Sequence, residues 1–263
     1  MGGGRMLIGG GGIGTVAIVL IAMFLGVDPG ELINATGQGQ PAPGQQAAPS
    51  GPRADDDLAT FSKQVLASTE DVWTEVLGGR YAAPTLVLFD GSTDAGACGV
   101  GQAAMGPFYC PPDRALYVDL SFFRQLDQRL GAPGDFAQAY VIAHEVGHHI
   151  QTLTGASAAA QRAMRSTNPT RANQISVRVE LQADCYAGVW ANHASNLLEP
   201  GDIEEGLRAA AAVGDDALQS QARGRVVPDS FTHGTSEQRA RWFTTGYRTG
   251  RMEDCDTFRA ASM

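Results

Sequence analysis

One short segment constrains this chain more than any other: residues 144–148 read His-Glu-Val-Gly-His. On a helix the second histidine lies about 40° round and about 6 Å along from the first, so both imidazoles can reach one ion from one face. The spacing therefore predicts His144 and His148 as metal ligands. Glu145 lies where it can take a proton from a water on the metal, so the motif indicates a hydrolytic zinc site with Glu145 as general base.

The residues around the motif predict the helix that it needs. Apolar side chains recur at helical spacing from Phe136 to Leu153, Asp135 can cap the first turn, and Gly155 can end the last. We expect a helix of about nineteen residues with the motif in its middle. The alternative is a surface helix in which two histidines coincide by chance. On the predicted helix His149 lies about 100° round from the second ligand and should point away from the ion.

A catalytic zinc needs a third protein ligand and an open position. A second periodic run, from about Asn173 to Asn196, carries Glu180 and Asp184 four residues apart on one face. We predict that Glu180 binds the metal and that Asp184 accepts the N–H of His144, which would fix the tautomer of that ring. A solvated acidic pair is the alternative, but small and apolar neighbours, and no lysines, surround these two residues.

A further histidine, His233, lies in a polar loop that runs into a predicted helix with Thr235 and Gln238 as its capping box. A loop histidine next to a glycine can donate to a developing oxyanion, so we predict His233 as a catalytic residue. Arg239, one turn into the helix, could orient His233 or itself donate to the oxyanion. We place it around the metal ligands and not among them. The alternative is a capping-loop histidine without a catalytic part.

Five separate blocks together resemble one family, the neutral zinc metallopeptidases of bacteria. They are residues 97–99, 106–111, 144–151, 176–190 and 232–236, and the resemblance extends from roughly Asp57 to Phe258. That family is similar to the gluzincins, in which the third ligand is a glutamate followed four residues later by an aspartate, the arrangement at Glu180 and Asp184. The resemblance implies a zincin-like peptidase fold, a Zn²⁺ cofactor and a peptide or protein substrate.

The remaining pattern predicts an α+β domain in which helices dominate. Residues 57–77 have helical spacing, residues 85–89 and 115–120 read as strands, and later helices are expected at about 202–222 and 236–250. A small sheet should therefore precede the metal-binding helix. We expect the strand that begins at Ala115 to lie at a sheet edge and to receive the substrate backbone, although a purely structural strand would look the same.

The amino-terminal segment predicts a membrane anchor. Residues 6–27 contain no charge, and at 1.5 Å per residue they reach about 33 Å, enough to cross a bilayer core. A cleaved signal peptide is the main alternative. We therefore divide the chain into an anchor (1–27), a Gly/Pro/Gln/Ala-rich linker (28–56) and a zinc metallopeptidase domain (57–263). Because Arg5 precedes the apolar run and Asp28 and Glu31 follow it, we expect a single-pass membrane protein with a cytoplasmic amino terminus and an extracytoplasmic domain.

The four cysteines are consistent with that compartment. Cys98, Cys110, Cys185 and Cys255 contain no Cys-x-x-Cys, which favours disulfides in an oxidising environment over a structural zinc or four buried thiols. Three pairings are possible. Pairing Cys98 with Cys110 closes a short loop, and Cys185 would then tie the second metal-binding helix to the carboxyl-terminal tail at Cys255.

These patterns favour a membrane-anchored zinc peptidase. The alternatives are a membrane-tethered scaffold that keeps the fold but cleaves nothing, and a zinc amidase that acts on cell-wall peptides. The net charge of −9 and the absence of lysine and arginine clusters disfavour nucleic-acid binding. No pattern indicates an oligomeric state.

Overall fold

The computed structural model describes residues 57–102 and 106–260, so the predicted anchor (1–27) and linker (28–56) lie outside the described residues. Within the described part, no helix combines the length and the apolar composition that crossing a bilayer requires. The main elements in chain order are α3 (Asp57–Leu77), β1 (Thr85–Phe89), β2 (Ser92–Asp94), β3 (Val100–Gln102), β4 (Phe108–Cys110), β5 (Ala115–Asp119), α4 (Leu120–Leu130), α5 (Asp135–Thr154), α6 (Ala156–Arg165), α7 (Pro169–His193), α8 (Asp202–Ala212), α9 (Asp215–Arg223), α10 (Ser236–Thr249) and the short 3₁₀ helix η6 (Met252–Cys255). Helices dominate an α+β fold with a small sheet, as predicted.

The two predicted metal-binding helices form as α5 and α7. Helix α5 ends at Gly155, which takes a left-handed conformation with φ of 83° and so terminates the helix. Helix α7 begins four residues earlier than predicted. The Asn168 side chain accepts a hydrogen bond from the Arg171 backbone N–H, and Pro169 stands in the first turn, where its missing N–H costs nothing.

The small sheet has the strand order β1-β5-β4, with β1 parallel and β4 antiparallel to β5. The prediction that the strand beginning at Ala115 lies at an edge is wrong. All five residues of β5 are buried, and this strand runs between its two neighbours. The edge strand next to α5 is β4, which is only three residues long and therefore shows no readable alternation in the sequence.

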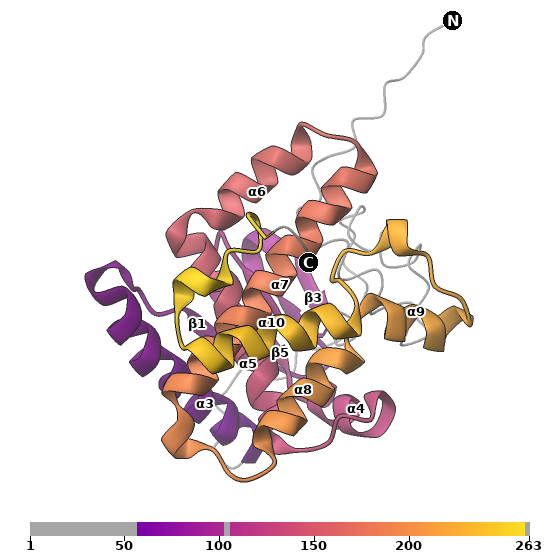
Figure 1. The fold of residues 1–263 in the computed structure, drawn as a ribbon. Helices are drawn as coiled ribbons and strands as arrows, with labels where there is room; N and C mark the ends of the chain where they lie inside the picture. The colour runs from indigo at the N-terminus through magenta and orange to yellow at the C-terminus, as the bar shows by residue number, and fades with distance from the viewer. Residues whose placement is uncertain (1–56, 103–105, 261–263) are drawn as a thin grey trace, which may run out of the picture.

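The predicted helix at about 202–222 is two helices, α8 and α9, which separate at Val213 and Gly214. The chain turns there because Gly214 lies against the start of α10: a Cβ on this glycine would overlap the backbone nitrogen and side chain of Ser236. The turn also brings Asp215, the first residue of α9, against the loop that carries His233. Figure 1 shows α10 crossing α7 near the middle of the molecule, with the strands of the sheet behind the helices in this view.

Glycines allow the central helices to approach closely. A Cβ on Gly188 of α7 would overlap the Phe243 carbonyl oxygen, and a Cβ on Gly246 of α10 would overlap the Cys185 carbonyl oxygen. Helices α5 and α7 approach in the same way, because a Cβ on Gly147 would lie 2.9 Å from the Ala183 carbonyl oxygen. These contacts set the separation of the three helices that carry the predicted site.

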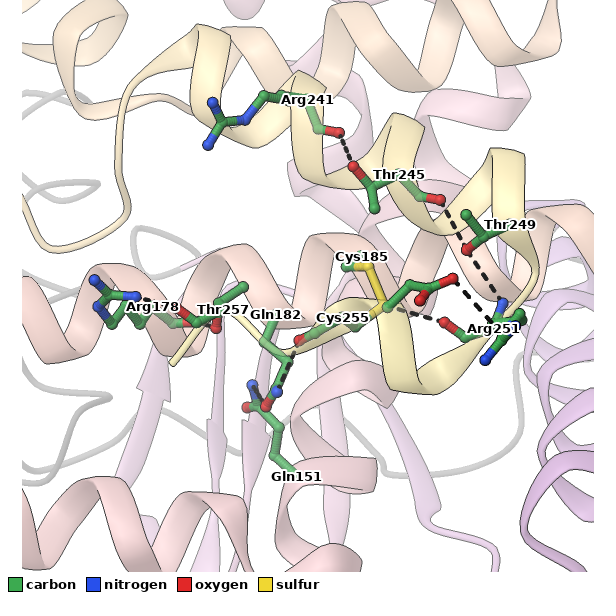
Figure 2. Close-up of a disulfide and its surroundings, with 11 residues drawn as sticks. Gln151, Arg178, Gln182, Cys185, Arg241, Thr245, Thr249, Arg251, Cys255 and Thr257 are labelled. Atoms are coloured by element: carbon green, nitrogen blue, oxygen red, sulfur yellow. Dashed lines mark hydrogen bonds and ion pairs between the residues drawn. A yellow bond between two sulfur atoms is a disulfide. The ribbon is translucent and has the colours of Figure 1, made fainter. Parts of the chain in front are cut away.

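Both disulfides form, in one of the three pairings that the sequence allowed. Cys98 pairs with Cys110 and so ties the β2–β3 hairpin region to β4. Cys185 of α7 pairs with Cys255 of η6, so the carboxyl-terminal segment is covalently attached to the second metal-binding helix (Figure 2).

We predict that Gly246→Ala destabilises the protein by about 3 kcal/mol, because α10 must move away from α7 to accommodate a methyl group. Urea denaturation of the purified protein measures this change. Gly79→Ala is the matched control, since no atom lies within 4 Å of the Cβ that it would add. Equal stability of the two variants would show that the α7–α10 contact is not tightly packed.

Candidate metal centre

The structure brings His144, His148 and Glu180 together at the contact between α5 and α7. The Nε2 atom of His144 lies 3.2 Å from Glu180 Oε2, and the Nε2 atom of His148 lies 3.6 Å from Glu180 Oε1. One donor atom from each residue falls within 4.8 Å of the others. Side chains from two helices, 32 residues apart along the chain at their nearest, therefore converge on one point, as the sequence predicted.

The donor set suits zinc. Two imidazole nitrogens and one carboxylate oxygen are the ligands of many catalytic zinc sites, and a tetrahedral ion held by three donors keeps one position for water or substrate. Among the described residues one other group brings three possible ligands together, namely Asp135, Asp202 and Glu205. That group offers only carboxylates and is more exposed, so the chemistry of its donors does not favour zinc.

The orientation of His144 depends on Asp184. Oδ1 of this carboxylate lies 2.8 Å from His144 Nδ1 and also accepts the hydroxyl proton of Tyr140. Because the Nδ1 atom is engaged on this side, the Nε2 atom of His144 is the one that faces Glu180. The structure thus places Asp184 behind His144, where the sequence predicted it.

Arg239 binds the same carboxylate and does not orient His233. Its Nε atom donates to Asp184 Oδ2 and its Nη2 atom to Oδ1, both at 2.8 Å, and Nη1 donates to the carbonyl oxygen of Val213. Arg239 thus lies behind a metal ligand and outside the direct ligands, where the sequence predicted it, but its contacts reach His144 through Asp184 and do not run to His233. Its guanidinium is committed to the buried carboxylate, because an unpaired charge there would be costly.

The three buried carboxyl groups of the site differ in their pKa values. Burial alone would raise all three, but Arg239 and His144 hold the pKa of Asp184 at about 2, and the neighbouring histidines hold the pKa of Glu180 well below its ordinary value. Burial prevails at Glu145, whose pKa is raised although His148 and His144 oppose the shift. Of the three, Glu145 is therefore the carboxyl group best suited to take and return a proton.

His233 is buried and held by a residue that the sequence analysis did not identify. Its Nδ1 atom lies 3.2 Å from Asp215 Oδ1, while Asp215 Oδ2 accepts the backbone N–H groups of Thr232, His233 and Gly234 at 2.7, 2.6 and 3.1 Å. The predicted capping box of α10 is present directly after this loop. After burial and the two histidines His148 and His144, His233 contributes to the lowered pKa of Glu180, so its charge acts at the metal-binding group.

His149 points away from the metal-binding group, as predicted. Its Nε2 atom lies 2.6 Å from the Ala82 carbonyl oxygen, and its Nδ1 atom lies 2.9 Å from the Tyr109 hydroxyl. The backbone of Tyr109 in turn makes a hydrogen bond to Glu145. The edge strand β4 is thus fixed beside the predicted general base.

Three residues around the site were not identified from the sequence. Tyr140 and Gln151 carry a weak signal, because they lie four residues before His144 and three residues after His148 and so share the ligand face of α5. Asp215 carries no such signal. It reaches His233 only because the chain turns between α8 and α9.

The fold and the donor set define a metal centre of the His-Glu-x-x-His type with a downstream glutamate, whose donors suit zinc. Comparison with known sequences agrees, since residues 1–258 match a family described as "Putative neutral zinc metallopeptidase". The chain belongs to this family, and membership implies Zn²⁺ as the cofactor.

Two relatives in other bacteria are themselves uncharacterized proteins. The chain is 48% identical to the uncharacterized protein YpfJ of Escherichia coli K12, over 97% of this chain and 89% of that protein. It is 43% identical to the uncharacterized protein Rv2575 of Mycobacterium tuberculosis H37Rv, over 92% of this chain and 86% of that protein. No solved structure matches the chain.

Proposed function

We propose that this protein is a membrane-anchored, extracytoplasmic zinc peptidase that hydrolyses peptide bonds with Glu145 as general base. The observation that carries the proposal is the position of Glu145, a buried carboxyl group of raised pKa directly beside His144, His148 and Glu180. A site kept only to bind metal has no physical need of this fourth group. Family membership supports a peptide substrate.

In this proposal His144, His148 and Glu180 hold the zinc. When bound there, zinc supplies Lewis-acid chemistry, which makes a water molecule more acidic and a carbonyl carbon more electrophilic. Glu145 takes the proton of the attacking water and later gives it to the nitrogen of the departing amine. Asp184 keeps the proton of His144 on Nδ1, so that Nε2 stays available as a ligand.

The edge strand β4 is the proposed site for the substrate backbone. Its neighbour β5 pairs with a strand on each side, whereas β4 pairs with β5 alone. The backbone of Tyr109 in β4 makes a hydrogen bond to Glu145. A peptide lying along this edge in an extended conformation would bring a scissile carbonyl beside the general base.

His233 is the proposed donor to the oxyanion. Asp215 engages its Nδ1 atom, so Nε2 is the atom that would donate to the oxyanion in this proposal. Because the same carboxylate also binds three consecutive backbone N–H groups, the ring is held before substrate arrives and needs little reorganisation.

We predict that Glu145→Gln lowers kcat for cleavage of an unfolded polypeptide by about 10² to 10⁴-fold and leaves zinc binding intact, because the amide cannot accept the proton. Peptide release and bound zinc are measured on the same preparation. Glu75→Gln, an exposed change on α3, is the control. Zinc binding without any cleavage that depends on Glu145 would favour the scaffold alternative, and release from cell-wall peptides alone would favour the amidase.

The role of His233 yields a separate prediction. His233→Ala should lower kcat by about 10² to 10³-fold with little change in KM, because an oxyanion donor acts in the transition state. Asp215→Asn should lower kcat by about 10-fold, since the ring stays but is held less firmly. Asp229→Asn, which changes an exposed aspartate shortly before the loop, is the control. Full activity of His233→Ala would leave this histidine with a structural role only.

The extracytoplasmic location is part of the proposal. The uncharged run at residues 6–27, the charges on either side of it and the two disulfides support it. We predict that an alkaline phosphatase fused after the last residue is active, because that enzyme folds only where disulfides form. An inactive phosphatase fusion, together with fluorescence from a cytoplasmic reporter fused at the same point, would contradict the extracytoplasmic location. That result would leave the proposed hydrolytic mechanism unaffected.

A further inference from the structure

We propose that Gln151 and Gln182 are positioning residues that form a directional relay from the carboxyl-terminal segment to His148, and that this relay fixes the tautomer in which His148 binds metal. The inference rests on the metal site of the proposed function and extends it to residues with no assigned role. It assigns the second histidine a partner equivalent to the one that Asp184 provides for the first.

The relay consists of three short contacts in series. Gln151 Oε1 lies 2.9 Å from His148 Nδ1, Gln151 Nε2 donates to Gln182 Oε1 at 3.1 Å, and Gln182 Nε2 donates to the Cys255 carbonyl oxygen at 3.0 Å. Gln151 Nε2 also donates to the carbonyl oxygen of Val179 at 2.7 Å. Figure 2 shows the two glutamine side chains in line between α5 and the segment that carries Cys255.

The direction of the relay follows from the groups at its ends. A backbone carbonyl can only accept, so the Cys255 oxygen requires the amide nitrogen of Gln182, and the Val179 oxygen requires the amide nitrogen of Gln151. The two amides then have one consistent orientation, in which Gln151 Oε1 faces His148. Because that oxygen is an acceptor, the proton of the neutral His148 ring must lie on Nδ1, and Nε2 is left as the metal-binding atom.

Burial makes the relay effective. Only 1% of Gln151 and 6% of Gln182 is exposed, so water cannot readily replace a lost partner, and an amide turned the wrong way would leave buried groups unpaired. The orientation of each amide is therefore fixed by its neighbours. The relay ends at the carboxyl-terminal segment, whose Cys255 carbonyl oxygen fixes the orientation of Gln182.

That segment is fastened along one face of α7. Arg178 donates to the carbonyl oxygen of Thr257 and accepts the Thr257 hydroxyl proton on its own carbonyl oxygen, Gln182 binds Cys255, and Cys185 forms the disulfide with Cys255 (Figure 2). The α7 positions of these contacts follow an i, i+4, i+7 pattern, which is one helical face. Both sulfur atoms belong to fully buried residues, so the disulfide is a fixed clamp and not an accessible redox switch.

The test compares three glutamine-to-methionine variants in the full chain, since methionine is unbranched and of similar length but offers no amide. Gln151→Met should raise the zinc Kd by about 10- to 100-fold, and Gln182→Met by about 10-fold although Gln182 touches no ligand. Gln219→Met is the matched control: it removes a buried glutamine that binds Val227 and Ser230 outside the relay, and should leave the zinc Kd unchanged. Competition with a chromophoric chelator measures the Kd, and thermal melting establishes that each variant is folded.

A second readout separates positioning from general loosening. In histidine-selective nitrogen NMR spectra of the zinc-loaded chain, the Nδ1–H proton of His148 should exchange faster with water in both relay variants. The Nδ1–H proton of His144, which is bound to Asp184, should be unchanged and serves as an internal control.

Folded relay variants with the wild-type zinc Kd and an unchanged His148 signal would overturn the proposal. Should Gln151→Met fail to fold, Gln182→Met decides alone, because it disturbs the relay farther from the metal. A wild-type chain that binds zinc and cleaves nothing would overturn the peptidase function and leave the relay intact, so the two failures are distinguishable.

Discussion

The buried carboxylate of Asp184 is the interaction on which the rest of the site depends. It is fully buried at the meeting point of three helices, and it binds His144 and Tyr140 of α5 and Arg239 of α10 while itself belonging to α7. Removing one partner of such a buried pair typically costs about 3–5 kcal/mol, because the remaining charge has no solvent. The same contact that orients a metal ligand therefore also requires the three helices to be assembled.

Small residues provide the geometry in which this carboxylate can reach its partners. Gly147 lies between the two histidine ligands, His144 and His148, along α5, and its backbone lies against Ala183 of α7. The reciprocal contacts of Gly188 and Gly246 place α10 close enough to α7 for the Arg239 side chain to bind Asp184 through two atoms. Larger residues at these positions would separate the helices and lengthen every contact in the site.

The sequence predicts the parts of the site whose geometry is local. The spacing of His144, Glu145 and His148 is set by one helix, and that of Glu180 and Asp184 by another, so 3.6-residue periodicity suffices to place them. Periodicity in the sequence could not identify Asp215 as the partner of His233, the break between α8 and α9, or the edge position of β4. Each of these depends on which segments meet in space. Periodicity could show that Gln151 faces the ligands, but not that Gln182 and the Cys255 carbonyl lie behind it.

The two histidine ligands have partners of different charge, and the difference has an electrostatic consequence. Asp184 is ionised, but Arg239 neutralises it. Behind His148 the partner is the neutral amide of Gln151. A carboxylate in that place would add an uncompensated negative charge close to Glu180 and Glu145, and like charges raise the pKa of a carboxyl group. Since burial already raises the pKa of Glu145, a further increase would favour its protonated form, which cannot act as a base. With an amide in that place, the ring is oriented without adding a negative charge that would raise the pKa of Glu145 further.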